Sequence, residues 1–167
     1  PRVHPAQGIS LTTLFKGLTE ERDLLLLLLQ GKLSAADVRR LKPESFTLAS
    51  GRKLVDIART HLDPDGRIIL RAVLDEAAED PECSDLATEL SMREDYFDDV
   101  PAHTQACLDN LDRKRTERAL RDLIERLKTA EREGRVDEAG SLNVQINEVR
   151  KRKDSTLSAG GVTLVKE

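Results

Sequence analysis

The amino-acid sequence predicts an all-α protein: a multi-helix globular bundle followed by a long connecting helix and a C-terminal helical hairpin. Aromatic residues make up only 2% of the chain and Trp is absent, so the core must be built from Leu, Ile, Val and Ala, which favours helices over sheets. Near the C-terminus, apolar residues recur at spacings of three and four on both sides of a short turn. With 167 residues, 38% of them apolar, the chain is long enough for one domain with its own core.

The chain divides into four predicted segments. We interpret residues 1–18 as a linker remnant, residues 19–112 as a globular helical subdomain, residues 113–153 as the hairpin and residues 154–167 as a flexible tail. The chain begins with Pro, and its only Met is at position 92. We therefore expect it to be a piece of a longer protein.

The first helix of the subdomain is expected at the centre of the bundle. Thr19 should cap it, with Glu20 and Glu21 in the first turn, where the helix dipole favours anions. Residues 24–29 are all Leu, and a helix that is apolar on every side belongs in the interior. Gly31 then ends the helix.

Two further helices should follow. Ser34 begins the first, which ends before Pro43 because a residue that precedes proline disfavours the helical conformation. Phe46 is expected to fill the core from the side in a short turn. The next helix should open at Ser50 or Gly51 and carry a continuous apolar face.

The second half of the subdomain begins with a turn. Residues 63–66 are Asp-Pro-Asp-Gly, a combination typical of turns. Amphipathic helices are expected at residues 68–78 and 86–92, each preceded by capping residues or Pro.

A long helix is expected to run from Pro101 to about Glu133 and to connect the bundle with the hairpin. The apolar stripes of the hairpin comprise Leu120, Leu123, Leu127 and Ala130 before the turn and Ala139, Leu142, Ile146 and Val149 after it. Gly134 should supply the left-handed conformation that ends the first helix. Because stripes this narrow bury little surface, the hairpin needs either the rest of the chain or a partner to be fully stable.

No residue pattern in the sequence indicates catalysis, and we expect a chain that is not an enzyme, with no metal and no cofactor. Cys83 and Cys107 lack the spacing of a zinc motif or a disulfide framework, which favours a reducing, cytoplasmic setting. His4, His61 and His103 are scattered along the chain. We interpret them as surface or cap residues rather than catalytic bases.

An acidic loop at residues 93–99 contains the only Tyr. We expect Tyr96 and Phe97 to anchor this loop while its acidic side chains stay solvated, because nothing in the sequence fixes their spacing for a metal ion. The longest apolar run, residues 24–29, is far shorter than the ~20 residues that a membrane-spanning helix requires. We therefore expect no contact with a membrane.

Charge is distributed unevenly along the chain. Residues 1–112 carry 13 basic and 21 acidic side chains, whereas residues 113–153 carry 13 basic and 8 acidic ones. The basic clusters at residues 113–115 and 150–153 should lie near each other at the base of the hairpin, which suits phosphate contacts. Acidic residues interleave with them and no aromatic residue is available for base stacking, so we expect weak or no direct binding of nucleic acid.

Three stretches of the sequence together form a recognisable pattern. The first is the leucine-rich helix at residues 22–30, and the second is Phe46 followed by Gly51-Arg52-Lys53-Leu54. The third is residues 123–134, followed by Glu138-Ala139, Leu142, Val149 and the terminal basic run. Over roughly residues 18–153, this pattern resembles the C-terminal, helicase-binding domain of bacterial replicative DNA primase.

The resemblance implies a non-catalytic module that couples primer synthesis to the replication fork. In that family a helical hairpin docks on the N-terminal domains of the helicase hexamer, and the zinc-binding and RNA-synthesising domains lie upstream. It also implies a possible contact with the acidic tail of the single-stranded-DNA-binding protein. The hairpin residues that we expect to contact the helicase are Arg126, Ala130, Glu131, Arg135, Val136, Gln145, Ile146, Val149 and Arg150.

Three alternatives stay open at this point. The N-terminal domain of the replicative helicase is similar in fold and also ends in a helical hairpin. The hairpin can instead self-associate as a short coiled coil, which would make the protein a homodimeric scaffold. A nucleic-acid-binding module is the third alternative, and its affinity would fall steeply with salt. For Leu127, Leu142, Ile146 and Val149, closing the hairpin is as plausible a role as contacting a partner.

Overall fold

All regular elements in the part of the chain that the structure describes are helical, which confirms the all-α prediction. The structure is a computed structural model that describes residues 10–159, without the side chains of residues 156–159. The chain divides into two units, which we call the body (Pro1–Leu111) and the hairpin unit (Asp112–Glu167) and treat separately. The division lies one residue before the predicted boundary.

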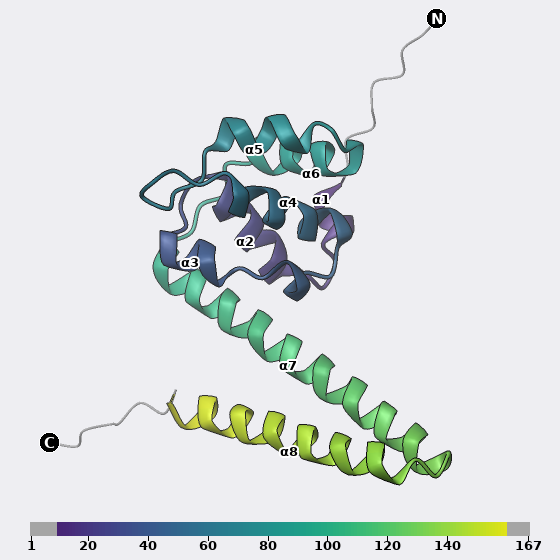
Figure 1. Cartoon of the computed structure of the whole chain (residues 1–167). Helices are drawn as coiled ribbons and strands as arrows, with labels where there is room; N and C mark the ends of the chain where they lie inside the picture. Colours follow the sequence, from purple (N-terminus) through teal and green to yellow (C-terminus); the bar gives the residue numbers. More distant parts are fainter. Residues whose placement is uncertain (1–9, 160–167) are drawn as a thin grey trace, which may run out of the picture. The chain divides into compact units, whose positions relative to one another are not determined.

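The helices follow one another as labelled in Figure 1. Their bounds are α1 Leu11–Leu14, α2 Thr19–Leu29, α3 Ala35–Arg40, the 3-10 turn η1 Pro43–Ser45, α4 Ala49–Thr60, α5 Leu70–Ala77, α6 Pro81–Ser91, α7 Val100–Arg132 and α8 Val136–Ala159. None of the helices within residues 10–159 combines the length and the apolar character that a membrane span requires. Helix α7 begins in the body and ends in the hairpin unit.

Helix α2 forms the centre of the body, as predicted. Every side chain of residues 24–29 is buried, and α2 packs against both α4 and α6, which also contact each other. Phe46 is fully buried in the same core. Glu21, in the first turn of α2, does more than interact with the helix dipole. It is buried and accepts hydrogen bonds from the backbone N–H (2.9 Å) and the hydroxyl (2.7 Å) of Thr47.

The predicted helix starts agree with the structure for α3 but not for α2 and α6. Ser34 caps α3 and accepts a hydrogen bond from the Asp37 N–H at 3.1 Å. Asp80 caps α6, so this helix begins five residues before the predicted start at residue 86. The prediction for α2 was wrong, since Thr19 is its first helical residue and the preceding Leu18 makes no side-chain cap.

The turn at residues 63–66 forms as predicted, with Gly66 at a φ of 80°. One carboxylate oxygen of Asp63 accepts the backbone N–H groups of Asp65 and Arg67, both at 2.9 Å. The turn is extended by an antiparallel bridge between Leu62 and Ile68. Because this bridge takes up Ile68, α5 begins two residues later than predicted.

Three other predictions need correction. Tyr96 does not anchor its loop, because 82% of the residue is exposed, whereas Phe97 is half-buried and stacks on the imidazole of His103. Helix α8 continues to Ala159, so the first residues of the predicted flexible tail are helical. The predicted linker contains helix α1, and Leu11 and Phe15 are buried in the core because they pack against it as apolar side chains. Residues 160–167 of the predicted tail and residues 1–9 of the predicted linker lie outside the described residues.

Candidate functional site

The turn between α7 and α8 is built by the backbone around Gly134. This residue has a φ of 70°, the left-handed conformation predicted for it. The N–H of Arg135 donates to the carbonyl of Ala130 at 2.8 Å, and the N–H of Gly134 donates to the carbonyl of Glu131 at 3.2 Å. These two bonds form a Schellman motif, which satisfies carbonyls that the end of α7 would otherwise leave without partners. The chain then turns directly into α8.

The two helices of the hairpin meet along a narrow seam, which we define by its buried side chains Ala130, Leu142 and Ile146. Leu127 and Val149 are half-buried beside it. This corrects the expectation that Ala130 and Ile146 belong to the exposed part of the hairpin. Residues three and four apart on a helix share one face, and here that face is covered by the other helix. Both residues therefore hold the hairpin together.

Six of the nine predicted contact residues are exposed: Arg126, Glu131, Arg135, Val136, Gln145 and Arg150. At the tip, Arg135 forms ion pairs with Glu133 (2.6 Å) and Glu138. Val136 follows directly and is 78% exposed. The tip thus combines a fixed guanidinium with an apolar side chain that faces solvent.

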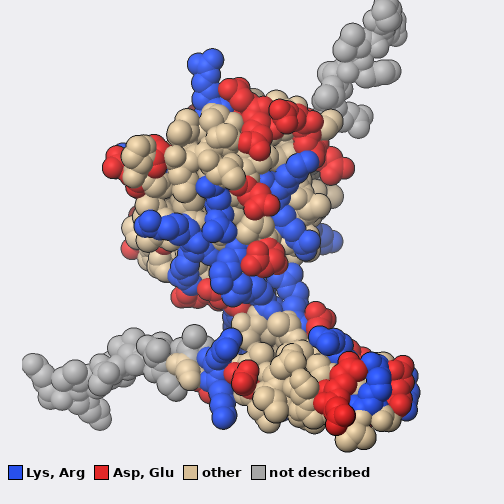
Figure 2. Space-filling view, in the orientation of Figure 1, with Lys and Arg blue, Asp and Glu red and all other residues tan. Residues whose placement is uncertain are grey.

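The first half of α8 contains a feature that sequence reasoning missed. Residues 139–147 carry no charged side chain, and Val144 within them is 59% exposed. Val136, Gly140 and Val144 are four residues apart and therefore lie along one face of α8. On the face shown in Figure 2, an uncharged area lies between charged groups of Lys, Arg, Asp and Glu at the two ends of the hairpin. The interruption in the charge pattern was visible in the sequence and identifies this face.

Acidic side chains accompany the basic clusters at the base of the hairpin. Lys153 and Glu117 approach to 4.0 Å across the two helices, and Arg115 and Asp112 approach to 4.0 Å along α7. The basic charge of this region is therefore partly balanced within the hairpin unit itself.

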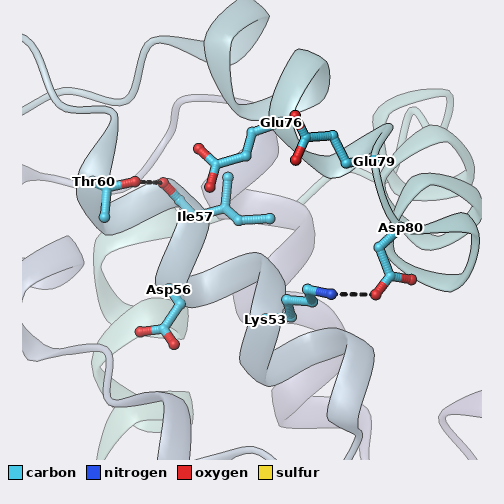
Figure 3. Close-up of a pocket in the computed structure, with 7 residues that line it drawn as sticks. All are labelled: Lys53, Asp56, Ile57, Thr60, Glu76, Glu79 and Asp80. Carbon is cyan, nitrogen blue, oxygen red and sulfur yellow. Dashed lines mark hydrogen bonds and ion pairs between the residues drawn. The ribbon is translucent and has the colours of Figure 1, made fainter.

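The body contains a separate pocket of about 480 Å³ (Figure 3). Its lining consists of Lys53, Asp56, Ile57, Thr60, Glu76, Glu79 and Asp80. Four of these seven residues are acidic, and the amine of Lys53 is paired with Asp80. The Lys53–Asp80 hydrogen bond raises the pKa of Lys53, and the same bond, with that from the Cys83 N–H, lowers the pKa of Asp80. Such a pocket attracts cations and repels an acidic peptide.

Comparisons with protein-family models, with curated proteins and with solved structures find no match to this chain. The choice between the candidate sites therefore rests on the chain's own residues. The hairpin unit offers an exposed apolar stripe between charged ends, and the body offers an acidic pocket. Of the two, the exposed stripe is the feature that folding alone does not explain, since a helix face that meets only water does not require valines.

Proposed function

We propose that this chain is a non-catalytic, cytoplasmic docking module of a bacterial replicative DNA primase, and that its hairpin unit binds the N-terminal domains of the replicative helicase. The observation that carries the proposal is the exposed face of α8, on which Val136 and Val144 meet solvent and residues 139–147 carry no charge. The resemblance of residues 18–153 to the helicase-binding domain of primases supplies the identity of the partner. Primer synthesis would belong to domains upstream in the parent protein.

The distribution of charge on the hairpin suits a protein partner. Protein interfaces combine a centre depleted of charge with a polar rim, and the centre contributes most of the binding free energy. Val136 and Val144 would form part of such a centre. Arg126, Glu131 and Arg150 would lie at its rim, where charged groups set orientation and association rate more than affinity.

Nucleic acid is a weaker candidate for the same surface. Single-stranded nucleic acid is held by basic grooves with aromatic side chains on which bases stack, and every aromatic residue of this chain precedes residue 98. The ion pairs of Lys153 and Arg115 also reduce the positive charge offered to phosphates. We therefore expect this module to bind nucleic acid directly only weakly or not at all.

Any contact with the acidic tail of the single-stranded-DNA-binding protein would have to use a surface other than the pocket of Figure 3. Carboxylates outnumber the single lysine there, so an acidic peptide would be repelled. Basic side chains elsewhere in the chain would have to receive it.

The proposal is tested by isothermal titration of the replicative helicase of the same organism with the full chain and with the double variant Val136→Asp, Val144→Asp. Two charges in the centre of an interface should weaken binding by roughly 100-fold or more, because each is desolvated without a partner. Met92→Asp is the matched control, since Met92 is 75% exposed on the body, and its affinity should equal that of the wild type.

Three outcomes would contradict the proposal. The first is equal affinity of the double variant and the wild type. The second is binding to the primase but not to the helicase, which identifies a helicase N-terminal domain instead. The third is concentration-dependent dimerisation that the double variant abolishes, which identifies a homodimeric scaffold.

A further inference from the structure

Three side chains of different chemistry converge inside the body. Asp23 comes from α2, whereas His103 and Cys107 come from the first turns of α7. A carboxylate oxygen, an imidazole nitrogen and a thiol sulfur from these residues all lie within 4.8 Å of one another. Asp23 and Cys107 are buried and His103 is half-buried, so the cluster lies at the edge of the core rather than on an open surface.

Helical geometry explains how the two α7 residues meet. His103 and Cys107 are four residues apart, and side chains at that spacing lie one above the other on the same face of a helix. Cys107 belongs to the face that packs into the core, together with Leu108 and Leu111. The same face meets the N-terminal part of α2, where Asp23 is buried.

Asp23 and Cys107 approach the same atom of the His103 ring. Both contacts of the imidazole use one atom: Nε2 of His103 lies 2.9 Å from Oδ2 of Asp23 and 3.6 Å from Sγ of Cys107. A ring nitrogen carries either one hydrogen or one lone pair, so it cannot form a full hydrogen bond with both neighbours. The shared nitrogen also excludes a Cys-His-Asp catalytic relay, in which the carboxylate and the nucleophile occupy different ring nitrogens.

The geometry points to a Zn²⁺ site with Asp23, His103 and Cys107 as its three protein ligands. Carboxylate oxygen, imidazole nitrogen and thiolate sulfur are the three donor types that zinc accepts in proteins, whereas Mg²⁺ and Ca²⁺ take oxygen ligands. Three protein ligands leave a fourth tetrahedral position for water, and the half-exposed His103 places the cluster within reach of solvent.

Neighbouring groups hold two of the ligands in place. Oδ1 of Asp23 accepts two hydrogen bonds from the Arg22 guanidinium, at 3.0 and 2.8 Å, which leaves Oδ2 directed at the cluster. The ring of Phe97 stacks on the imidazole with a centroid distance of 4.5 Å and an interplanar angle of 19°. Such outer contacts orient ligands and are part of a working metal site.

Binding of zinc requires the Cys107 thiol to lose its proton. Burial, followed by the charges of Asp23 and Glu20, raises the pKa of this thiol to about 11, so the side chain is a neutral thiol when no metal is bound. When the ion enters, the S–H bond breaks, the proton passes to water or buffer and the sulfur lone pair forms the bond to zinc. The oxidation state of the metal does not change.

The test uses the full chain, stripped of metal with a chelator and kept reduced. Titration with Co²⁺, which replaces Zn²⁺ and absorbs light, should saturate at one ion per chain and produce a thiolate-to-cobalt charge-transfer band. Zn²⁺ should displace the cobalt and raise the melting temperature of the chain, since a ligand that binds only the folded state stabilises it. A folded chain that binds no ion at neutral pH would overturn the assignment.

Two pairs of variants then locate the site. Cys107→Ser and His103→Gln should each lower zinc affinity by roughly 100-fold or more, at least the loss caused by removing an outer-shell partner. The controls are Cys83→Ser, at a second buried thiol, and His61→Gln, at a second histidine that pairs with a carboxylate within the described residues. Neither control should change the affinity.

Circular dichroism shows which variants are folded. If Cys107→Ser does not fold, the cobalt spectrum of His103→Gln decides. Wild-type zinc affinity in a folded variant of either ligand would contradict the site. None of these measurements depends on helicase binding, so the zinc site and the docking proposal are tested independently of each other.

Discussion

Helix α7 passes through two different environments. Within the body it buries one continuous face, formed by Thr104, Cys107, Leu108 and Leu111. Within the hairpin unit the same helix continues the same periodicity, yet Leu120, Leu123 and Leu127 are only half-buried and Ala130 alone is buried. The apolar spacing is similar on both sides of residue 111. The difference lies in how many helices are available to cover it.

The comparison shows how stability and surface are divided in this chain. In the body, α2 is surrounded on all sides, so six consecutive leucines are buried. Two helices alone cover only one face of each other, and α8 keeps Val136 and Val144 in solvent. The body therefore supplies most of the folding free energy, and the hairpin unit supplies exposed surface.

The largest expected effect is a cavity in the body. Leu26→Ala should lower the free energy of unfolding by about 3–5 kcal/mol, because the side chain is fully buried and its neighbours cannot fill the space. Urea unfolding followed by circular dichroism measures the change. Val144→Ala, at an exposed position of α8, should stay within ~0.5 kcal/mol of the wild type. Similar losses of unfolding free energy for the two variants would contradict the claim that the body supplies most of the folding free energy.

The second prediction concerns the seam of the hairpin. Leu142→Ala should lower the free energy of opening the hairpin unit by about 2–3 kcal/mol. This value is in the lower part of the range for buried leucines, because a seam between only two helices can relax around the missing atoms. Hydrogen exchange should show faster exchange in α8 and unchanged protection in α2. Loss of protection in α2 as well would mean that the two units unfold together.

Two glycines of the hairpin unit should respond with opposite signs to the same substitution. Gly134→Ala should destabilise by about 1–2 kcal/mol, because its φ of 70° strains any residue that has a Cβ atom. Gly140→Ala should raise the free energy of unfolding by up to about 1 kcal/mol, because this residue lies inside α8 and a Cβ there meets nothing within 4 Å beyond the adjacent residues and the backbone of its own helix. Thermal unfolding of the two variants measures both. A change of stability in the same direction for both variants would contradict the left-handed conformation of Gly134 in the turn.

The smallest expected effect concerns the ion pair on the body's surface. The pKa of Asp80 is lowered in the folded state, chiefly by its hydrogen bond with Lys53, so its carboxylate contributes stability above the unfolded value of 3.8 and loses it as the pH falls through the folded value. Asp80→Asn keeps a capping side chain but removes the charge. The variant should be slightly less stable at pH 7, and the difference should shrink below pH 3.8. A constant difference would exclude this ion pair as its cause.

Local chemistry made much of the fold predictable. Gly134, Ser34 and the turn at residues 63–66 fix the backbone through their own conformations and hydrogen bonds, so the sequence alone identifies them. Tyr96 and the start of α5 depend on what the rest of the chain places beside them, and both predictions were wrong. Burial of an aromatic ring is a property of the tertiary fold, which periodicity does not specify.

The candidate sites follow the same rule. The hairpin and its apolar stripes were predictable, but the burial of Ala130 and Ile146, which removes them from the exposed surface, depends on the relative rotation of the two helices. His103 and Cys107 are four residues apart in the sequence, but the sequence-based prediction recognised no metal-ligand spacing at Cys107 and treated His103 as a surface or cap residue. Their third partner, Asp23, lies 80 residues before His103, and only the packing of α2 against α7 brings it there.

The central claim is that docking on the helicase depends on the hairpin unit. The most direct measurement is isothermal titration of the replicative helicase with the full chain and with a version that ends at Leu111, at moderate and at high salt. We expect binding by the full chain that persists at high salt, because the contact is centred on uncharged residues, and no binding by the shortened chain. Equal binding by the two chains, or no binding by a folded and monodisperse full chain, would contradict the account.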